Sequence, residues 1–197
     1  MWAGSTIRFG RALRTGDEIE RISRIEAVEA KLGRSGALCF VTVRHVFEAG
    51  GEMAVEEHQD IVYREPATGT GRPPSAHPAP SGTWSAPCQA GPTLLFRYSA
   101  LTFNGHRIHY DRRFAVEEEQ YPGLVVHGPL QATLLLNYAS ALMGGRALSA
   151  FAFRSTSALF DDDRFSLNAE KTGEDAMRLW TARERGAVAM TAEARWT

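Results

Sequence analysis

One long apolar helix constrains this fold more than any other feature of the sequence. Residues 124–143 contain no Asp, Glu, Lys or Arg and place large apolar side chains at helical spacing. Gly144-Gly145 is predicted to end this helix. Strand-like runs follow at residues 147–156, 158–170, 176–183 and 187–196. One apolar helix followed by antiparallel strands predicts an α+β fold in which the sheet wraps round the helix. The predicted apolar face consists of Leu130, Leu134, Leu135, Tyr138, Ala141 and Leu142.

A proline-rich segment divides the chain ahead of that helix. Seven of the nine prolines lie between Pro66 and Pro92, together with Gly, Ser, Thr and Ala and almost no aliphatic residues. Such a segment buries too little apolar surface to offset the entropy of ordering it, so we predict a linker over residues 67–91. An ordered surface loop wrapped over a domain is the alternative. The linker separates a first part, residues 1–66, from a second part, residues 92–197.

The first part alternates apolar and polar residues, which is typical of strands. Residues 37–47 are rich in β-branched and aromatic residues and predict one strand. Residues 53–63 predict another after a hairpin turn at Gly50-Gly51. Residues 21–31 fit a half-buried strand, although the spacing of Ile22, Ile25 and Val28 also fits a helix. Long strands without a helix form a sheet whose apolar face needs a cover, and the first part supplies none.

The charge balance excludes several classes of function. The 197 residues carry a formal net charge of −1, which argues against a nucleic-acid-binding protein and against a polybasic protein of the membrane surface. The sequence has no apolar run long enough for a transmembrane helix, and its start lacks the pattern of a secretory signal. The two cysteines, Cys39 and Cys88, have no close His or Cys partners for a zinc site and cannot form a disulfide scaffold. We therefore expect a cytoplasmic protein without a bound metal, and interpret Asp161-Asp162-Asp163 as turn residues.

The residues that suggest chemistry lie in two short segments. Asn104 precedes His109 by five positions, and His127-Gly128 starts the long helix 18 residues later. A histidine exchanges protons near neutral pH, and an amide can orient a water or a substrate oxygen. Unpaired N–H groups at a helix start can stabilise charge on a thioester or enolate oxygen, and Gly128 lets an acyl group approach the backbone. These residue types suit acyl-thioester chemistry; a purely structural His and Asn pair, with an ordinary helix start, is the alternative.

Residues 98–111 and 126–132 resemble the MaoC-like hydratase/dehydratase family. Within it, the likeness is to the double hot-dog branch that includes mesaconyl-C4-CoA hydratase and mitochondrial-type 3-hydroxyacyl-thioester dehydratase. Ile108 and His109 match the family motif, Asn104 stands where most of the family has Asp, and Gly128 matches the glycine of the oxyanion hole. The resemblance implies a double hot-dog fold, with antiparallel sheets wrapped round a long central helix and the site in the C-terminal unit. Residues 1–66 then form an N-terminal unit that is incomplete, because the helix and first strand expected ahead of them are absent.

The resemblance also implies a reaction, the reversible hydration of an α,β-unsaturated acyl-CoA by acid–base catalysis. Asn104, His109 and Gly128 are then the catalytic residues, and no cofactor is needed beyond the CoA of the substrate. An amide cannot act as a base, so proton transfer falls on His109 while Asn104 holds the water. We expect His127, Arg112 and Arg154 to contact the substrate or its CoA part.

Two other functions remain open at this stage. A hot-dog acyl-CoA thioesterase is disfavoured, because it usually needs a carboxylate on the long helix and residues 124–143 contain none. A non-catalytic acyl-CoA-binding protein is the other alternative. The uncovered sheet face of the first part also predicts a homo-oligomer.

Overall fold

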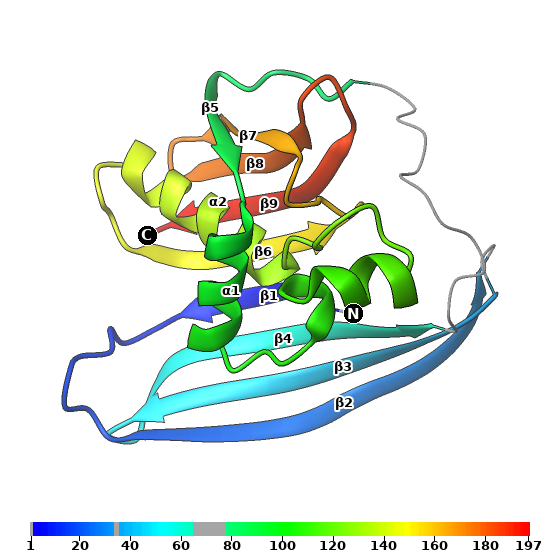
Figure 1. Cartoon of the computed structure of the whole chain (residues 1–197). Helices are drawn as coiled ribbons and strands as arrows, with labels where there is room; N and C mark the ends of the chain where they lie inside the picture. The colour runs from blue at the N-terminus through cyan, green and yellow to red at the C-terminus, as the bar shows by residue number, and fades with distance from the viewer. Residues whose placement is uncertain (1, 34–35, 65–77) are drawn as a thin grey trace.

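The computed structural model describes residues 2–33, 36–64 and 78–197 and contains one nine-stranded sheet (Figure 1). The strand order is β2-β3-β4-β1-β6-β9-β8-β7-β5, and neighbouring strands are antiparallel. The strands are β1 (Trp2–Phe9), β2 (Ile19–Gly33), β3 (Gly36–Ala49), β4 (Glu52–Arg64), β5 (Trp84–Gln89), β6 (Leu148–Ser155), β7 (Arg164–Gly173), β8 (Ala176–Arg183) and β9 (Val188–Trp196). The helical segments are α1 (Pro92–Leu101), η1 (Arg107–His109), η2 (Phe114–Glu118) and α2 (Gly128–Leu142).

The first part of the chain contributes β1 to β4. Residues 21–31 lie within β2, so the strand alternative is correct and the helical one is wrong. Gly50 and Gly51 both have positive φ angles, 61° and 78°, as the hairpin turn between β3 and β4 requires. β1 was not predicted from the sequence; it pairs with β4 on one side and with β6 on the other. This strand joins the two parts of the chain into one continuous sheet.

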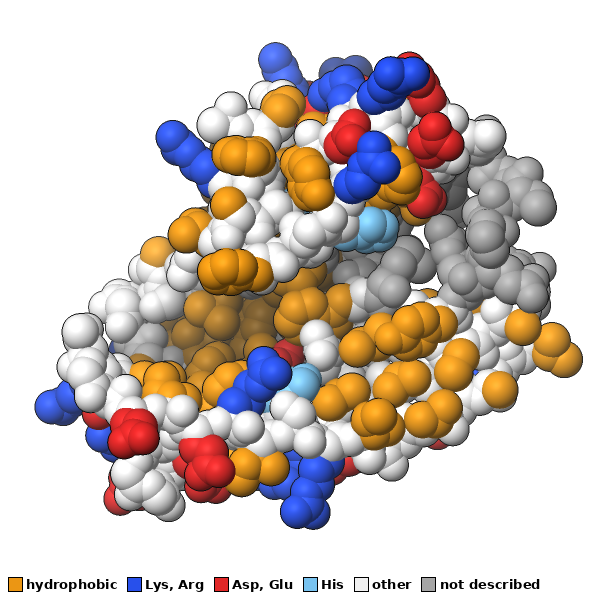
Figure 2. All heavy atoms as spheres, turned by 60° about the horizontal axis from the view of Figure 1, so that its bottom comes forward, with side chains coloured by type: hydrophobic (Ala, Val, Ile, Leu, Met, Phe, Trp, Pro, Cys, Tyr) orange, Lys and Arg blue, Asp and Glu red, His pale blue; other side chains and the backbone are white. Residues whose placement is uncertain are grey.

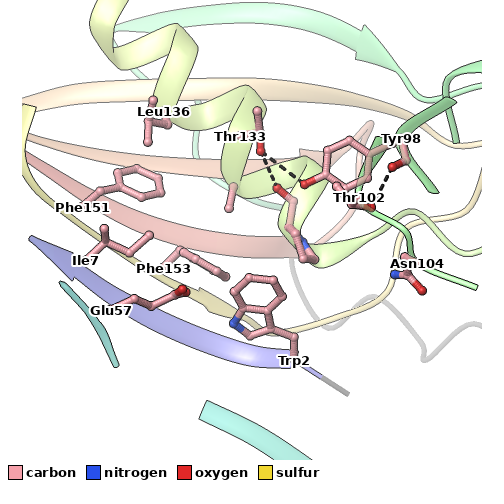
Figure 3. Close-up of a pocket in the computed structure, with 12 residues that line it drawn as sticks. Trp2, Ile7, Glu57, Tyr98, Thr102, Asn104, Thr133, Leu136, Phe151 and Phe153 are labelled. Carbon is pink, nitrogen blue, oxygen red and sulfur yellow. Dashed lines mark hydrogen bonds between the residues drawn. The ribbon is translucent and has the colours of Figure 1, made fainter. Parts of the chain in front are cut away.

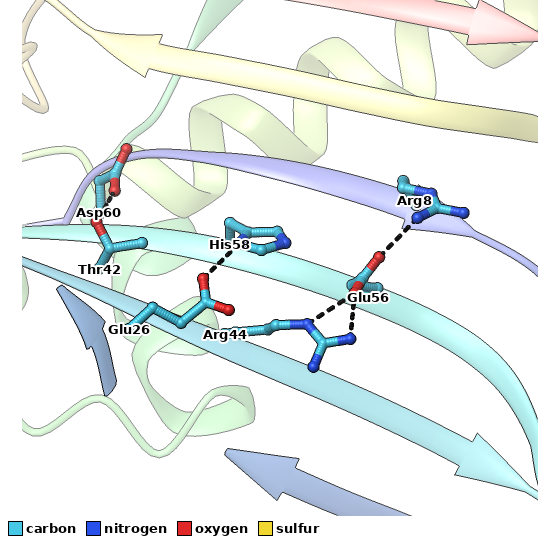
Figure 4. A network of polar contacts seen from close by, with 7 residues as sticks. All are labelled: Arg8, Glu26, Thr42, Arg44, Glu56, His58 and Asp60. Atoms are coloured by element: carbon cyan, nitrogen blue, oxygen red, sulfur yellow. Dashed lines mark hydrogen bonds and ion pairs between the residues drawn. The ribbon is translucent and has the colours of Figure 1, made fainter. Parts of the chain in front are cut away.

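The two faces of β2–β4 differ in polarity. On the outer face, Glu56 bonds Arg8 and Arg44, while His58 pairs with Glu26 across the strands (Figure 4). The inner face carries apolar side chains from β2, and Ile25, Val28 and Leu32 are 69%, 64% and 93% exposed. Figure 2 shows hydrophobic side chains spread over these strands. Of the two long helices in the described ranges, α2 packs against β1 and β6–β9, and these β2 side chains stay exposed.

The long helix α2 packs against the inner face of β6–β9, as the α+β prediction requires (Figure 1). Leu135 and Ala139 are fully buried there, and buried Gln131 accepts a hydrogen bond of 2.7 Å from Thr181 on β8. The buried face is therefore turned slightly from the predicted one, which included Tyr138 and other residues that are only partly buried. The core also contains buried side chains from β6, β7, β8 and β9, among them Phe151, Phe165, Met177, Leu179, Met190 and Ala194.

Several predicted boundaries in the second part need correction. Residues 84–89 of the predicted linker form β5, which pairs with β7 and lies at the sheet edge, where Pro87 costs no ladder bond. Residues 67–77 of that linker lie outside the described residues. The predicted helix start at His127-Gly128 is confirmed, since α2 begins at Gly128; just before it, Val125 bridges to Phe160 and the Val126 N–H donates to Leu159. The strand predicted over residues 158–170 begins only at Arg164.

Candidate active site

The end of α1 places Asn104. The N–H of Phe103 donates to Ala100 and that of Asn104 donates to Ser99, the bond pattern that closes a helix with a left-handed residue. Phe103 takes that left-handed position with φ 53°, where glycine is the usual residue. The Asn104 side-chain oxygen then accepts the N–H of His106 at 3.0 Å. Its NH₂ group is left as the free end, a donor suited to a water or hydroxyl oxygen.

His109 is fixed in one tautomer by the backbone. Its Nδ1 lies 2.7 Å from the carbonyl oxygen of Val125, and a carbonyl only accepts, so Nδ1 carries the proton. The Nε2 atom is then an unprotonated acceptor. His109 is 8% exposed, and burial lowers its pKa, with a bond to Val125 opposing and the neighbouring His106 adding to this decrease. The ring is therefore neutral near pH 7, with a basic nitrogen available for proton transfer.

His127 lies directly against His109. The two rings are stacked, with centroids 3.7 Å apart and planes 18° apart. The Nε2 atom of His127 lies 2.9 Å from the Ser99 hydroxyl, and the ring is 1% exposed. Burial, together with the charge of His109, lowers the pKa of His127 to about 3. The expected contact of His127 with substrate or CoA therefore needs correction, because this ring belongs to the protein interior.

The start of α2 supplies backbone donors beside this histidine pair. His127 is the N-cap residue and its side chain makes no capping bond, so the first N–H groups of the helix have no side-chain acceptor from it. A Cβ at Gly128 would lie 3.2 Å from the Ser155 hydroxyl, which is tighter than ordinary contact. Glycine is therefore favoured here by the close approach of the helix to β6.

A cavity of about 380 Å³ opens between the helices and the middle of the sheet (Figure 3). Asn104 lines it, as do Pro129 and Thr133 from α2, but His109 and Gly128 are not among its lining residues. Its sheet wall comes from both parts of the chain, with Trp2, Ile7 and Glu57 from the first and Phe151 and Phe153 from the second. Figure 2 shows hydrophobic side chains on the floor of a hollow. The two parts of the chain thus share this cavity.

A carboxylate interrupts the apolar side chains on the sheet wall of this cavity. The Glu57 carboxylate accepts the Ser5 hydroxyl at 2.7 Å, and Ser5 in turn accepts the indole N–H of Trp2 at 2.8 Å. Glu57 comes from β4 and both partners from β1, so a chain of hydrogen bonds fixes the carboxylate at the junction of the two parts. A negative charge in the cavity wall bears on which acyl groups fit there.

The two arginines expected to bind CoA have different positions. Arg112 is half-exposed and forms an ion pair with buried Asp161, whose carboxylate also accepts the Leu124 N–H. Arg154 is exposed on the outer face of β6, because Phe153 on the same strand points to the cavity and neighbouring residues alternate. The structure therefore does not bring Arg154 to the cavity.

Asp161 and Asp163 serve the backbone in the loop before β7. Asp163 accepts the N–H of Phe160 and pairs with Arg183, while Asp161 holds Leu124. Over the described ranges, no group of three His, Cys, Asp or Glu side chains gathers as a metal site would require. No helix in the part of the chain that the structure describes is both long and apolar enough to cross a membrane.

Sequence reasoning missed four residues of this site. Ser99 and Tyr98 both lie against His127, the latter with its ring edge-on at a centroid distance of 5.0 Å. Trp2 and Glu57 form part of the cavity wall. Ser99 and Tyr98 fall within the motif segment that the resemblance covers, so their positions were an available signal. Trp2 carried none, because β1 was not recognised, and the place of Glu57 in the cavity wall depends on the pairing of β4 with β1.

Comparison with known proteins identifies the family. The profile described as hydroxyacyl-thioester dehydratase type 2 matches residues 1–161. The chain belongs to the hydroxyacyl-thioester dehydratase type 2 family. A mesaconyl-C(4)-CoA hydratase of Chloroflexus aurantiacus is 45% identical over 197 residues, which cover 98% of this chain and 68% of that protein. Members of the dehydratase family are hydro-lyases of acyl thioesters, so the predicted enzyme class is confirmed.

Solved structures confirm the predicted fold. A MaoC-like dehydratase of Phytophthora capsici aligns with 100% of this chain and 71% of its own, with a TM-score of 0.79 and 16% identity. A Mycobacterium tuberculosis protein described as a double hot-dog aligns with 99% of this chain and 74% of its own, with a TM-score of 0.61 and 14% identity. This member of the dehydratase family therefore has a double hot-dog architecture, as its motif segments implied.

Proposed function

We propose that this dehydratase-family protein catalyses the reversible hydration of an α,β-unsaturated acyl-CoA, and that a short branched acyl group of the mesaconyl-C4 type is among its substrates. The observation that carries the proposal is the neutral His109, whose Nε2 is an unprotonated acceptor close to the start of α2. The relative that is 45% identical supports the choice of acyl group. We assign catalysis to His109, Asn104 and Gly128.

In the hydration direction, His109 acts first as a base. Its Nε2 accepts a proton from water while the water oxygen bonds to the β-carbon, and the electron pair of the double bond moves toward the thioester carbonyl. The resulting imidazolium then returns a proton to the α-carbon, which completes the addition of one water molecule. The Asn104 NH₂ group donates to the water oxygen and so sets the direction of attack, because the amide oxygen is already held by His106.

The thioester oxygen gains negative charge during this addition. We assign to the N–H of Gly128, at the positive end of α2, the role of donor to that oxygen. Such donors lower the barrier because they are already oriented before the reaction begins. In dehydration the same N–H acidifies the α-proton, and His109 and Asn104 reverse their roles.

The two alternative functions, an acyl-CoA thioesterase and a non-catalytic acyl-CoA-binding protein, would require different groups at this cavity. Hydrolysis of the thioester would need a carboxylate near the carbonyl carbon, and α2 carries no Asp or Glu over its whole length. Among the described residues that line the cavity, Glu57 is the one carboxylate, and it is bound by Ser5 on the sheet wall. A binding protein without catalysis would not require a tautomer-locked histidine. Hydration is therefore the reaction that the described groups support best.

The decisive assay follows two signals in one cuvette. Loss of absorbance at the enoyl-thioester band without release of free thiol reports hydration, and loss with thiol release reports hydrolysis. Crotonyl-, mesaconyl- and itaconyl-CoA serve as substrates. Binding of these compounds without either signal would identify an acyl-CoA-binding protein and overturn the proposal.

The remaining expectations concern partners and place. We propose that Arg112 contributes to binding the CoA phosphates, since its guanidinium is half-exposed beside the site. Self-association through the apolar face of β2 and β3 stays a prediction, which sedimentation velocity tests directly. A cytoplasmic location stays a prediction as well.

A further inference from the structure

A buried histidine with one unpaired nitrogen stands next to the proposed base. His127 is 1% exposed, its Nε2 is bonded to Ser99, and its Nδ1 has no hydrogen-bond partner. A buried polar atom without a hydrogen bond lowers the free energy of unfolding, a cost that a Phe or Leu of similar size at this position would avoid. The fold alone therefore gives no reason for a histidine here, and its contacts indicate what it does.

The contacts of His127 converge on the proposed catalytic groups. One face of its ring is stacked on His109 at 3.7 Å, and its backbone is the N-cap of α2, directly before Gly128. Its Nε2 is bound to Ser99, whose carbonyl oxygen also accepts the N–H of Asn104 at 2.9 Å. Ser99 of α1 thus contacts both the His127 ring and the backbone of Asn104.

We propose that His127 and Ser99 are positioning residues for the hydration site, and that the anchored His127 ring holds the His109 imidazole in the orientation that directs its Nε2 to the substrate. This inference rests on the proposed function, in which His109 transfers the proton. Neither residue touches the substrate in this account, because both are buried behind His109.

The surroundings of the two rings define what a variant changes. From η1 and the turn before it, His106 meets His109 edge-on at a centroid distance of 5.7 Å. Tyr98 and Ser99 of α1 contact His127. Leu124, next to the Val125 that bonds His109, donates its N–H to Asp161, which pairs with Arg112. Removing the His127 ring admits water beside His109, so the pKa of His109 should rise toward its ordinary value of 6.5.

The first test is a double-mutant cycle on kcat. His127→Ala is expected to lower kcat by about 10- to 100-fold with little change in KM, since a misplaced catalytic group loses rate and not binding. In a His109→Ala background the same substitution should cost less than about threefold, because its effect acts through His109. An equal loss in both backgrounds would show that His127 acts independently of His109 and would overturn the proposal.

The second test needs no turnover. Titration of the His109 ring protons by NMR should give a higher pKa in His127→Ala than in the wild-type protein, and the acid limb of the kcat/KM profile should move to higher pH with it. A damaged fold would lower the folded fraction without moving that limb. If the wild-type protein lacked hydratase activity, the proposed function would fail, whereas an unshifted His109 titration would refute the positioning role itself.

Ser99→Ala keeps both rings and removes the anchor. We expect a smaller loss of kcat, about three- to tenfold, with KM unchanged. Ser140→Ala is the matched control, because Ser140 is a helix serine whose hydroxyl bonds a backbone carbonyl at the far end of α2. If Ser99→Ala and Ser140→Ala behave alike, the anchoring role of Ser99 is wrong.

Discussion

Lowering the pH from 7 to 5 should destabilise the protein through His127. The pKa of this ring is about 3 in the folded protein, lowered from 6.5 by burial and then by the charge of His109. Because the folded pKa lies below the unfolded one, the unfolded chain binds a proton in this window that the folded chain does not, and stability falls as the pH decreases. At about 1.4 kcal/mol for each full pH unit below 6.5, the free energy of unfolding should drop by about 2 kcal/mol between pH 7 and pH 5 from this ring alone.

Urea unfolding at pH 7, 6 and 5, followed by circular dichroism, measures this loss. His127→Phe keeps an aromatic ring against His109 but cannot bind a proton, so its stability should depend less steeply on pH, by about 2 kcal/mol across the window. His106→Phe removes an exposed ring from the same neighbourhood and serves as the control. The window avoids acid effects from carboxylates such as Glu56, whose pKa is lowered by its hydrogen bond from Arg44. If the free energy of unfolding falls equally with pH in the wild type and in His127→Phe, the reasoning is refuted.

Four further outcomes are expected. In the enoyl-thioester assay, His109→Ala should lower kcat by about 10²- to 10⁴-fold, the usual contribution of general acid–base catalysis. The kcat of His106→Ala should stay within about threefold of the wild-type value, because the His106 ring only meets His109 edge-on. Asn104→Ala should cost less than His109→Ala, and Asn104→Asp should keep activity with a shifted pH profile, because an aspartate oxygen can still accept the His106 N–H that fixes the turn. Leu135→Ala, at a fully buried position of α2, should lower the free energy of unfolding by about 2–5 kcal/mol in the same urea experiment. Glu57→Gln should raise the ratio of the hydration rates of mesaconyl-C4-CoA and crotonyl-CoA by about fivefold. The substitution removes a negative charge from the cavity wall that a carboxylate on the acyl group would meet. An unchanged ratio would show that the end of the acyl group lies elsewhere.

The parts of this structure that local sequence determines were predictable. Residues 37–47 and 53–63 follow a period of two strictly enough to read as strands, and β3 and β4 contain them. The apolar stretch after residue 124 and the His127-Gly128 start predicted the helix, and α2 begins at Gly128. The bonds of Val125 to Ile108 and of Val126 to Leu159, just before it, join partners that the local pattern does not reveal. β1 escaped recognition because Gly4 and Ser5 interrupt its pattern, and its strand conformation comes from β4 and β6, which lie far away in the sequence.

The candidate site was predictable only as far as its motif. Asn104, His109 and Gly128 were identified by family resemblance, whereas the role of His127 was misjudged as a substrate contact. Its burial depends on Ser99 and His109, which lie 28 and 18 residues earlier and meet it only through the fold. Arg154 was misjudged for a related reason, because the face of β6 that meets the cavity depends on where α2 packs.

The central position of β1 in the sheet separates two properties of the site, its proton-transfer groups and the shape of the cavity for the acyl group. The groups assigned to proton transfer lie between α1 and α2, in the second part of the chain, while Trp2, Ile7 and Glu57 on the opposite cavity wall come from the first. A change of side chain on β1 or β4 can therefore reshape the room for the acyl group without moving the histidine pair. Substrate preference within this family could diverge through a few substitutions in its first sixty residues, with the chemistry left intact. Conversely, any cut that detached β1 would open the cavity on one side, even though it removed none of the residues that handle the proton.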